Sequence, residues 1–208
     1  MAVPLYPLHR AAGARRVVVS TYQAASGAGM RAMLELKEQT REFLEGKKPT
    51  KKVFRHQIAF NLFSHDSKIR DDGFTEEEYK MIEETKKIFH APDFKLIPTT
   101  IRVPVLRAHS ESIVVELERP VSENEAREIF KKAPGVKLVD DRNSNYFPMP
   151  IEASGGDEVL VGRIRKDPST ETGLAFFVSG DQLRKGAALN AIQIAEILFE
   201  VKKSKVNA

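Results

Sequence analysis

An α+β fold, with a mixed or largely antiparallel sheet and packed helices, is predicted for this 208-residue chain. The first reason is that extended apolar runs arrive in clusters between helical stretches, rather than in strict strand–helix alternation. The second is a composition of 41% hydrophobic and 30% charged residues, which is typical of a globular protein. The third is the length, which suits one ordinary domain or two small ones with no internal repeat.

The first predicted elements are a buried strand and an amphipathic helix. Residues 17–22 are mostly β-branched and precede a glycine-rich turn, which indicates a buried strand. The apolar and basic residues 1–16 are expected to lead smoothly into it. Apolar residues then recur at helical spacing over 33–44, and this helix is expected to stop at Gly46, with Pro49 just beyond.

Two further helices begin with recognisable caps. Thr75 and Glu78 form a capping-box pattern at the start of the second helix, and Ser122 and Glu125 repeat it before the third. The remaining elements are expected as strands near 95–106, 112–117, 136–139, 159–164 and 174–178, a long loop at 140–157 and a last helix near 183–201.

Composition excludes several classes of protein. The chain has no cysteine, so it can hold no disulfide, no thiolate metal site and no thiol nucleophile, and no metal is expected. No apolar run approaches the roughly 20 residues of a membrane span, and the N-terminus lacks the apolar centre of a secretory signal. We expect a soluble protein of the cytoplasm, or of the plastid stroma if the source is a photosynthetic eukaryote.

The charge distribution leaves two interpretations of one basic segment. The net charge of +4 is mild, but lysines cluster over 47–52 and are followed by Arg55 and His56. Such a cluster is either a nucleic-acid patch or a solvated loop after a helix. The loop is favoured because no interleaved aromatic residues or known nucleic-acid motif accompany the lysines, so no nucleic-acid partner is expected.

A polar residue and a glycine-rich turn follow the first strand. Gln23 directly precedes the turn that contains Ser26 and Gly27. A turn of this kind between strand and helix can bring backbone amides close to a phosphate or a planar ligand. It matches neither a dinucleotide fingerprint nor a P-loop, so an ordinary tight turn is the alternative.

His109 stands out among the five histidines because it ends a strand that carries Arg102 and Arg107. Nearby positive charge favours the neutral imidazole, which would suit a general base. In a regular strand, however, Arg102 and His109 point to opposite faces because they are seven residues apart. They share a site only if a bulge or a strand end intervenes, which Pro104 would favour. A purely structural histidine is the alternative.

Two helical sets of polar residues complete the candidates. Glu77 and Lys80 lie three apart on the second helix, and by themselves they read as an exposed ion pair. Asn190 and Gln193 lie on the alanine-rich face of the last helix, close to Lys185. Amides on a packing face need partners, so a ligand or another subunit is expected there.

Three long motifs in series give these residues a family context. Residues 20–29 read STYQAASGAG, residues 101–112 read IRVPVLRAHSES and residues 180–190 read GDQLRKGAALN. Together they resemble matching segments of aspartate-semialdehyde dehydrogenases, and the resemblance covers nearly the whole chain. The likeness is strongest to the plant, cyanobacterial and Gram-positive branch. It implies that residues 1–208 are the C-terminal catalytic and dimerisation domain, in which 1–20 and 183–208 resemble segments that pack on an NADP domain.

The resemblance also implies a reaction. The family reduces aspartyl phosphate with NADPH to aspartate semialdehyde, on the way to lysine, threonine and methionine, through a cysteine-bound thioester. By this resemblance His109 would be the acid/base, Gln23 would orient the acyl group and Arg102 would clamp the substrate carboxylate.

The same resemblance assigns ligands to the remaining candidates. Glu77 would meet the substrate amino group and Lys80 the phosphate. Ser26, Gly27 and Asn190 would border the nicotinamide end of NADP.

The chain departs from the family in one large respect. The family's cysteine motif would fall a few residues before Met1, and the glycine-rich NADP fold lies further upstream. The chain alone is therefore expected to be inactive. It is read either as a fragment of a working dehydrogenase or as a non-catalytic dimerisation or structural subunit, partnered in a homodimer or with a full-length homologue.

Overall fold

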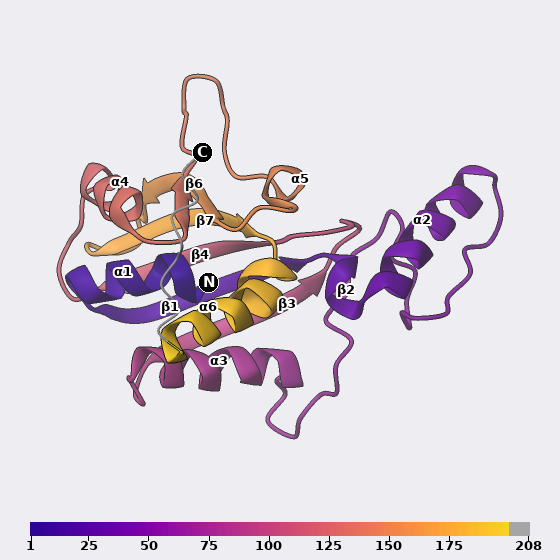
Figure 1. Cartoon of the computed structure of the whole chain (residues 1–208), viewed down its shortest axis with the longest axis horizontal. Coiled ribbons are helices and arrows are strands. Elements are labelled where there is room, and N and C mark those ends of the chain that lie inside the picture. The colour runs from indigo at the N-terminus through magenta and orange to yellow at the C-terminus, as the bar shows by residue number, and fades with distance from the viewer. Residues whose placement is uncertain (200–208) are drawn as a thin grey trace.

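The computed structural model describes residues 1–199 and is built around one seven-stranded sheet with the order β2-β3-β1-β4-β7-β6-β5 (Figure 1). Its strands are β1 (Ala14–Gln23), β2 (Phe63–Ser64), β3 (Lys95–Arg102), β4 (His109–Leu117), β5 (Val136–Leu138), β6 (Val159–Lys166) and β7 (Gly173–Gly180). Strand pairs β1–β3 and β5–β6 are parallel and the other four pairs are antiparallel. The predicted mixed α+β architecture is confirmed.

The helices are α1 (Ala2–Ala12), α2 (Met30–Leu44), α3 (Glu76–Phe89), α4 (Glu123–Lys132), α5 (Pro150–Ala153) and α6 (Leu189–Leu198), with a 3-10 turn η1 (Ala25–Ala28) and a π-type turn η2 (Arg184–Ala188). Helices α1, α3 and α4 pack together and against the sheet. The main core lies between them, because alternate side chains of β1, β4 and β7 point to this face, among them Val17, Ile113 and Phe176. None of the described helices is long and apolar enough to cross a membrane.

Helix α2 projects from the sheet as an arm, seen at the right of Figure 1. The arm has a small core of its own, formed by Ala25, Ala32, Leu36, Phe54, Ile58 and Ala59. Two buried polar residues of α2 bind the segment that leads from the end of this helix back to the sheet. Glu35 accepts hydrogen bonds from the backbone N–H groups of residues 52–54, and Gln39 accepts from those of residues 58 and 59. Because Ala25 belongs to this core, the arm supports the turn that follows β1.

Both predicted helix starts are confirmed. The Thr75 hydroxyl accepts from the Glu78 N–H and the Glu78 carboxylate accepts from the Thr75 N–H, which is a complete capping box. Ser122 accepts from the Glu125 N–H at the start of α4. The predicted strand 95–106 is shorter than expected, because it ends at Arg102 and Pro104 has no N–H with which to continue a ladder.

The structure corrects the predictions at both ends. Residues 2–12 form α1 rather than a lead-in to the strand, and Leu5 and Leu8 are fully buried in the main core. The last helix is interrupted at Lys185 and Gly186, where Gly186 has a φ of 137°. Its expected end near Val201 lies outside the described residues.

Candidate active site

The site begins at one edge of the sheet, where three neighbouring strands meet. Parallel strands β1 and β3 end side by side, so that Gln23 and Arg102 are direct register partners. Strand β4 runs antiparallel to β1, and its first residue, His109, therefore starts at the same edge. Strand register thus brings together three residues that are far apart in sequence.

Arg102 and His109 share one space, although residues seven apart in a regular strand would point to opposite faces. The strand ends after Arg102, and the chain turns back through residues 103–108, with Ala108 at a φ of 71°. A methyl group placed on Gly27 would lie 3.1 Å from Arg102 Nη1 and 3.2 Å from His109 Nε2. Gly27 therefore leaves open the space on which both side chains converge.

His109 is held as a neutral ring with a defined tautomer. The Ala24 N–H donates to His109 Nδ1 at 3.1 Å, so the neutral ring carries its hydrogen on Nε2, the atom that faces Gly27. Burial, reinforced by the nearby positive charge of Arg102, lowers the pKa of His109 to about 3. The predicted direction is confirmed, but burial contributes more than the charge. In this arrangement Nε2–H is a hydrogen-bond donor.

Arg102 is 5% exposed and is held by three groups. Its Nη1 donates to the Ala24 carbonyl at 3.3 Å, and its Nη2 donates to His65 Nε2 at 2.7 Å. Asp66 Oδ1 lies 3.7 Å from Nε, which has no hydrogen-bond partner within the described chain. Burial lowers the pKa of Arg102, and the carboxylates of Asp66 and Glu77 partly offset this effect.

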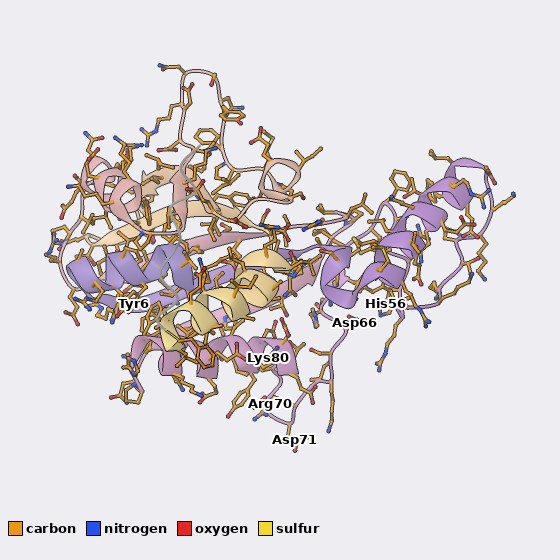
Figure 2. All side chains as sticks on the ribbon, viewed as in Figure 1. Tyr6, His56, Asp66, Arg70, Asp71 and Lys80 are labelled. Atoms are coloured by element: carbon orange, nitrogen blue, oxygen red, sulfur yellow. The ribbon has the colours of Figure 1, made fainter. Side chains whose placement is uncertain are left out.

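Glu77 and Lys80 lie at the first turns of α3, facing this edge. The Gln23 amide donates to Glu77 Oε1 at 3.2 Å, and Lys80 Nζ lies 3.3 Å from Glu77 Oε2. Burial opposes ionisation of Glu77, but the charge of Lys80 and the Gln23 hydrogen bond favour it, and the pKa of Glu77 lies below its ordinary value. Figure 2 shows Lys80 on α3, and Asp66 on the segment that returns from the arm. Glu77 is thus part of the site as well as half of the expected ion pair.

The turn after β1 borders the same space. Backbone N–H groups of Ala25 and Ser26 donate to the carbonyls of Val105 and Leu106, which fixes the turn against residues 103–106. Ser26 is buried, and its hydroxyl accepts from the Gln182 amide at 2.5 Å. Gln182 follows Asp181, whose buried carboxylate pairs with Arg107 at 2.7 Å.

Asn190 is placed differently from the other predicted residues. It lies on α6 in a groove of about 1010 Å³ that also contains Tyr6, Lys185 and Gln193. Lys185 Nζ donates to Gln193 at 2.7 Å, which gives that amide a partner. The side-chain oxygen of Asn190 is buried without a partner in residues 1–199, and no hydrogen bond joins Asn190 to Ser26 or Gly27 there.

Three residues of the site, His65, Asp66 and Gln182, were not predicted from the sequence. The short strand β2 pairs with the end of β3, and the His65 N–H then donates to the Thr100 carbonyl at 2.9 Å, which places His65 beside Arg102. No spacing or periodicity in residues 60–68 signals this role. Gln182 lies inside the third motif and could have been singled out as a polar residue two positions after a strand.

Comparison with known proteins gives one consistent result. Residues 5–185 match the family model described as "Semialdehyde dehydrogenase, dimerisation domain". The chain is 54% identical over 200 residues to an aspartate-semialdehyde dehydrogenase of Synechocystis sp. and 44% identical over 206 residues to that of Bacillus subtilis. These alignments cover 96% and 95% of this chain, but only 59% and 60% of the relatives.

Solved structures agree with the sequence matches. Aspartate semialdehyde dehydrogenase II of Vibrio cholerae, "complexed with ASA", superposes with a TM-score of 0.93 at 40% identity, over 97% of this chain and 59% of that one. The enzyme of Candida albicans "with NADP" shares the fold with a TM-score of 0.68 at 22% identity, over 95% of this chain and 54% of that one. This chain therefore belongs to the semialdehyde dehydrogenase family, and its residues 5–185 correspond to the dimerisation domain of that family.

Proposed function

We propose that this chain supplies the acid/base and substrate-binding half of an aspartate-semialdehyde dehydrogenase site. The reaction would be the NADPH-dependent reduction of aspartyl phosphate to aspartate semialdehyde and phosphate, in lysine, threonine and methionine biosynthesis. The cysteine nucleophile and the main NADP fold would come from a segment outside these residues, so the 208-residue chain alone would be inactive. The bacterial relatives favour a cytoplasmic location.

The observation that carries this proposal is the position of Met1. Its backbone nitrogen lies 2.8 Å from Glu111 Oε2, and the Met1 side chain is 6% exposed. Glu111 is two residues from His109 on β4, so the two side chains lie on the same face of the sheet. A segment leading into Met1 would therefore arrive beside His109. The resemblance puts the cysteine of the family a few residues before this point.

The charges at the site suit an amino-acid acyl phosphate. Arg102 can bind the substrate carboxylate, because Nη1 donates one of its two hydrogens to the Ala24 carbonyl and Nη2 donates one of its two to His65. Each nitrogen therefore keeps one hydrogen for the substrate. Glu77, held ionised, would receive the ammonium group, and Lys80 at the rim would receive the phosphate. The cysteine thiolate would displace phosphate from the acyl group to give a thioester.

His109 and Gln23 would serve the acyl group after thioester formation. The Nε2–H of His109 would donate to the oxygen that gains negative charge, and a thiolate nearby would raise the low pKa of His109. The Oε1 atom of Gln23 is buried without a partner in residues 1–199, so its amide has spare capacity to orient the substrate.

Gln182 beside the turn and Asn190 in the separate α6 groove each offer an acceptor for a nicotinamide group. The side-chain oxygens of Gln182 and Asn190 are buried without partners in the described chain, and a carboxamide NH₂ would satisfy such an acceptor. Gly27 leaves an opening that a Cβ would fill. When bound, NADPH supplies the hydride. We propose that Ser26, Gly27 and Asn190 border its nicotinamide end, while Ser26 stays fixed by Gln182.

The open face of the sheet supports the homodimer part of the proposal. Ile97, Val18, Val114 and Ala175 form one row across β3, β1, β4 and β7, on the face opposite the main core. Ile97 is 40% exposed and Tyr22, on the same face of β1, is 37% exposed. An apolar row of this kind is a candidate interface with a second copy or with a full-length homologue. A strict monomer in sedimentation equilibrium would contradict this part.

The activity test compares two preparations. The purified 208-residue chain is assayed for NADP- and phosphate-dependent oxidation of aspartate semialdehyde, and no turnover is expected. The same chain joined to a segment that carries the cysteine and the NADP fold is expected to turn over. Activity of the 208-residue chain alone, or inactivity of a folded joined protein, would refute the proposal.

A further inference from the structure

We propose that His65 is a positioning residue, which holds the Arg102 guanidinium ready for a substrate carboxylate and does so only as the neutral Nδ1–H tautomer. This inference rests on the proposed function, because it takes Arg102 as the carboxylate clamp. It concerns a residue outside all three motifs that carry the family resemblance.

The geometry around Arg102 requires such an acceptor. A guanidinium has only donors, so the 2.7 Å contact between Nη2 and His65 Nε2 makes Nε2 the acceptor. The Nη1 bond to the Ala24 carbonyl is longer, at 3.3 Å, and Asp66 lies 3.7 Å from Nε. His65 therefore makes the shortest contact among the three groups that orient the guanidinium.

The tautomer follows from the other nitrogen of the ring. A neutral imidazole whose Nε2 accepts must carry its hydrogen on Nδ1. His65 Nδ1 lies 3.0 Å from Ser67 Oγ, which can accept this hydrogen, and the Ser67 backbone N–H also points at Nδ1 from 3.2 Å. The guanidinium can only donate, so its shorter 2.7 Å contact with Nε2 decides between the two tautomers in favour of Nδ1–H. Ser67 Oγ also accepts from the Glu77 N–H at 3.3 Å, so the Ser67 hydroxyl ties the ring to the first turn of α3. A chain of hydrogen bonds thus runs from α3 through Ser67 and His65 to Arg102.

If His65 were lost, it would no longer compete with the Asp66 carboxylate for the Arg102 guanidinium. The Asp66 carboxylate already lies within 4 Å of Nε, which has no hydrogen-bond partner in residues 1–199. Without the bond to His65, the guanidinium is free to turn toward Asp66 and to pair with it side-on. A clamp paired in this way would no longer face the substrate. His65 thus keeps a competing internal carboxylate from occupying the clamp.

Protonation of His65 would have the same effect as its removal. The charged groups facing it are Arg102 from β3, Glu77 and Lys80 from α3, and the adjacent Asp66, with His109 across the site. Burial, followed by the charge of Arg102, lowers the pKa of His65 below 6.5, so the ring is neutral at neutral pH. Below its folded pKa the ring gains a second hydrogen, loses its acceptor and repels Arg102. Affinity for the substrate should therefore fall on acidification.

The kinetic test uses the holoenzyme, the chain together with its cysteine and NADP segment. His65→Ala should raise KM for aspartate semialdehyde about tenfold and change kcat by less than about twofold, since a bond to a charged group is lost. His65→Gln, which keeps an acceptor, should restore most of the affinity and remove the acid limb of the KM profile. Adding Asp66→Asn to His65→Ala should recover part of the loss. His56→Ala, which removes an exposed histidine that packs near the Phe63 ring, is the matched control.

A second measurement separates failure of this inference from failure of the proposed function. Long-range ¹H–¹⁵N NMR spectra of the 208-residue chain at pH 7.5 should identify His65 as the Nδ1–H tautomer and His109 as the Nε2–H tautomer. An Nε2–H tautomer at His65, or an active His65→Ala enzyme with unchanged KM and pH profile, overturns the positioning role. An inactive wild-type holoenzyme refutes the proposed function, and the tautomer of His65 then decides this inference by itself.

Discussion

The arm supports a sharp prediction at Glu35. In Glu35→Gln, an NH₂ group replaces one of two oxygens that together accept four hydrogen bonds, from the backbone of residues 52–54 and from Gln39. Each oxygen accepts two of these bonds, so whichever oxygen is replaced, two N–H groups lose their acceptor and face the new NH₂ group. The two remaining bonds also lose the assistance of the charge.

The expected magnitude follows from these bonds. Each lost bond to a charged group is worth about 1.5–3 kcal/mol, and water reaching residues 52 and 53 offsets part of this. We therefore expect a loss of about 2–4 kcal/mol, concentrated in the arm. Glu38→Gln is the matched control on the same helix, because the Glu38 side chain is 44% exposed and, within residues 1–199, hydrogen-bonds to Arg41 alone. It should cost less than about 0.5 kcal/mol.

The assay combines urea unfolding with amide hydrogen exchange. The amides of residues 52–54 should exchange much faster in Glu35→Gln than in Glu38→Gln, while those of β1 and β4 keep their protection. Because Ala25 packs in the arm core, the turn at Ser26 should also exchange faster. Equal stability and equal exchange in the two variants would refute the assigned role of Glu35.

Three further predictions concern the site. Gly27→Ala should lower kcat/KM of the holoenzyme about tenfold or more and change the free energy of unfolding by less than about 1 kcal/mol. Gly156→Ala is the control, because its added methyl group would also lie 3.2 Å from a neighbouring atom, a backbone carbonyl oxygen, and it should leave the kinetics unchanged. Equal kinetics for the two variants would contradict an open space at Gly27. His109→Ala should reduce turnover and Arg102→Leu should mainly raise KM, and identical effects on affinity alone would argue against these roles. The unfolded chain binds a proton at His109 below about pH 6.5 but the folded one only near its pKa of about 3. The free energy of urea unfolding should therefore fall more steeply on acidification in wild type than in His109→Gln, by up to about 1.4 kcal/mol per pH unit. If the unfolding free energies of the two proteins changed in parallel with pH, a buried neutral ring would be excluded.

Most strands and most helices were predictable because local patterns decide them. The β-branched run in β1 and the capping box at Thr75 each specify an element without help from distant residues. Helix α1 was missed because Pro4 and Pro7 argue against a helix, although Leu5 and Leu8 repeat at helical spacing. Here burial of the apolar stripe in the main core outweighs the poor local propensity.

The site was only partly predictable because its residues meet through tertiary pairing. Arg102 and His109 were singled out by type, but whether they share a space depends on where β3 ends. His65 reaches Arg102 through a two-residue strand that no sequence pattern announces. The orientation of the clamp is therefore a property of three-dimensional packing and not of any motif.

The two sides of the site differ in how firmly the fold holds them. Gln23, Arg102 and His109 are fixed by the register of three central strands, so they should keep their relative positions until the sheet itself melts. His65, in contrast, depends on β2, a two-residue strand at one edge of the sheet, and on its contacts with Ser67. Warming short of global unfolding should thus release the histidine first. Substrate affinity would then decay at a lower temperature than turnover, and the working range of the enzyme would be limited by a two-residue strand at the margin of the sheet.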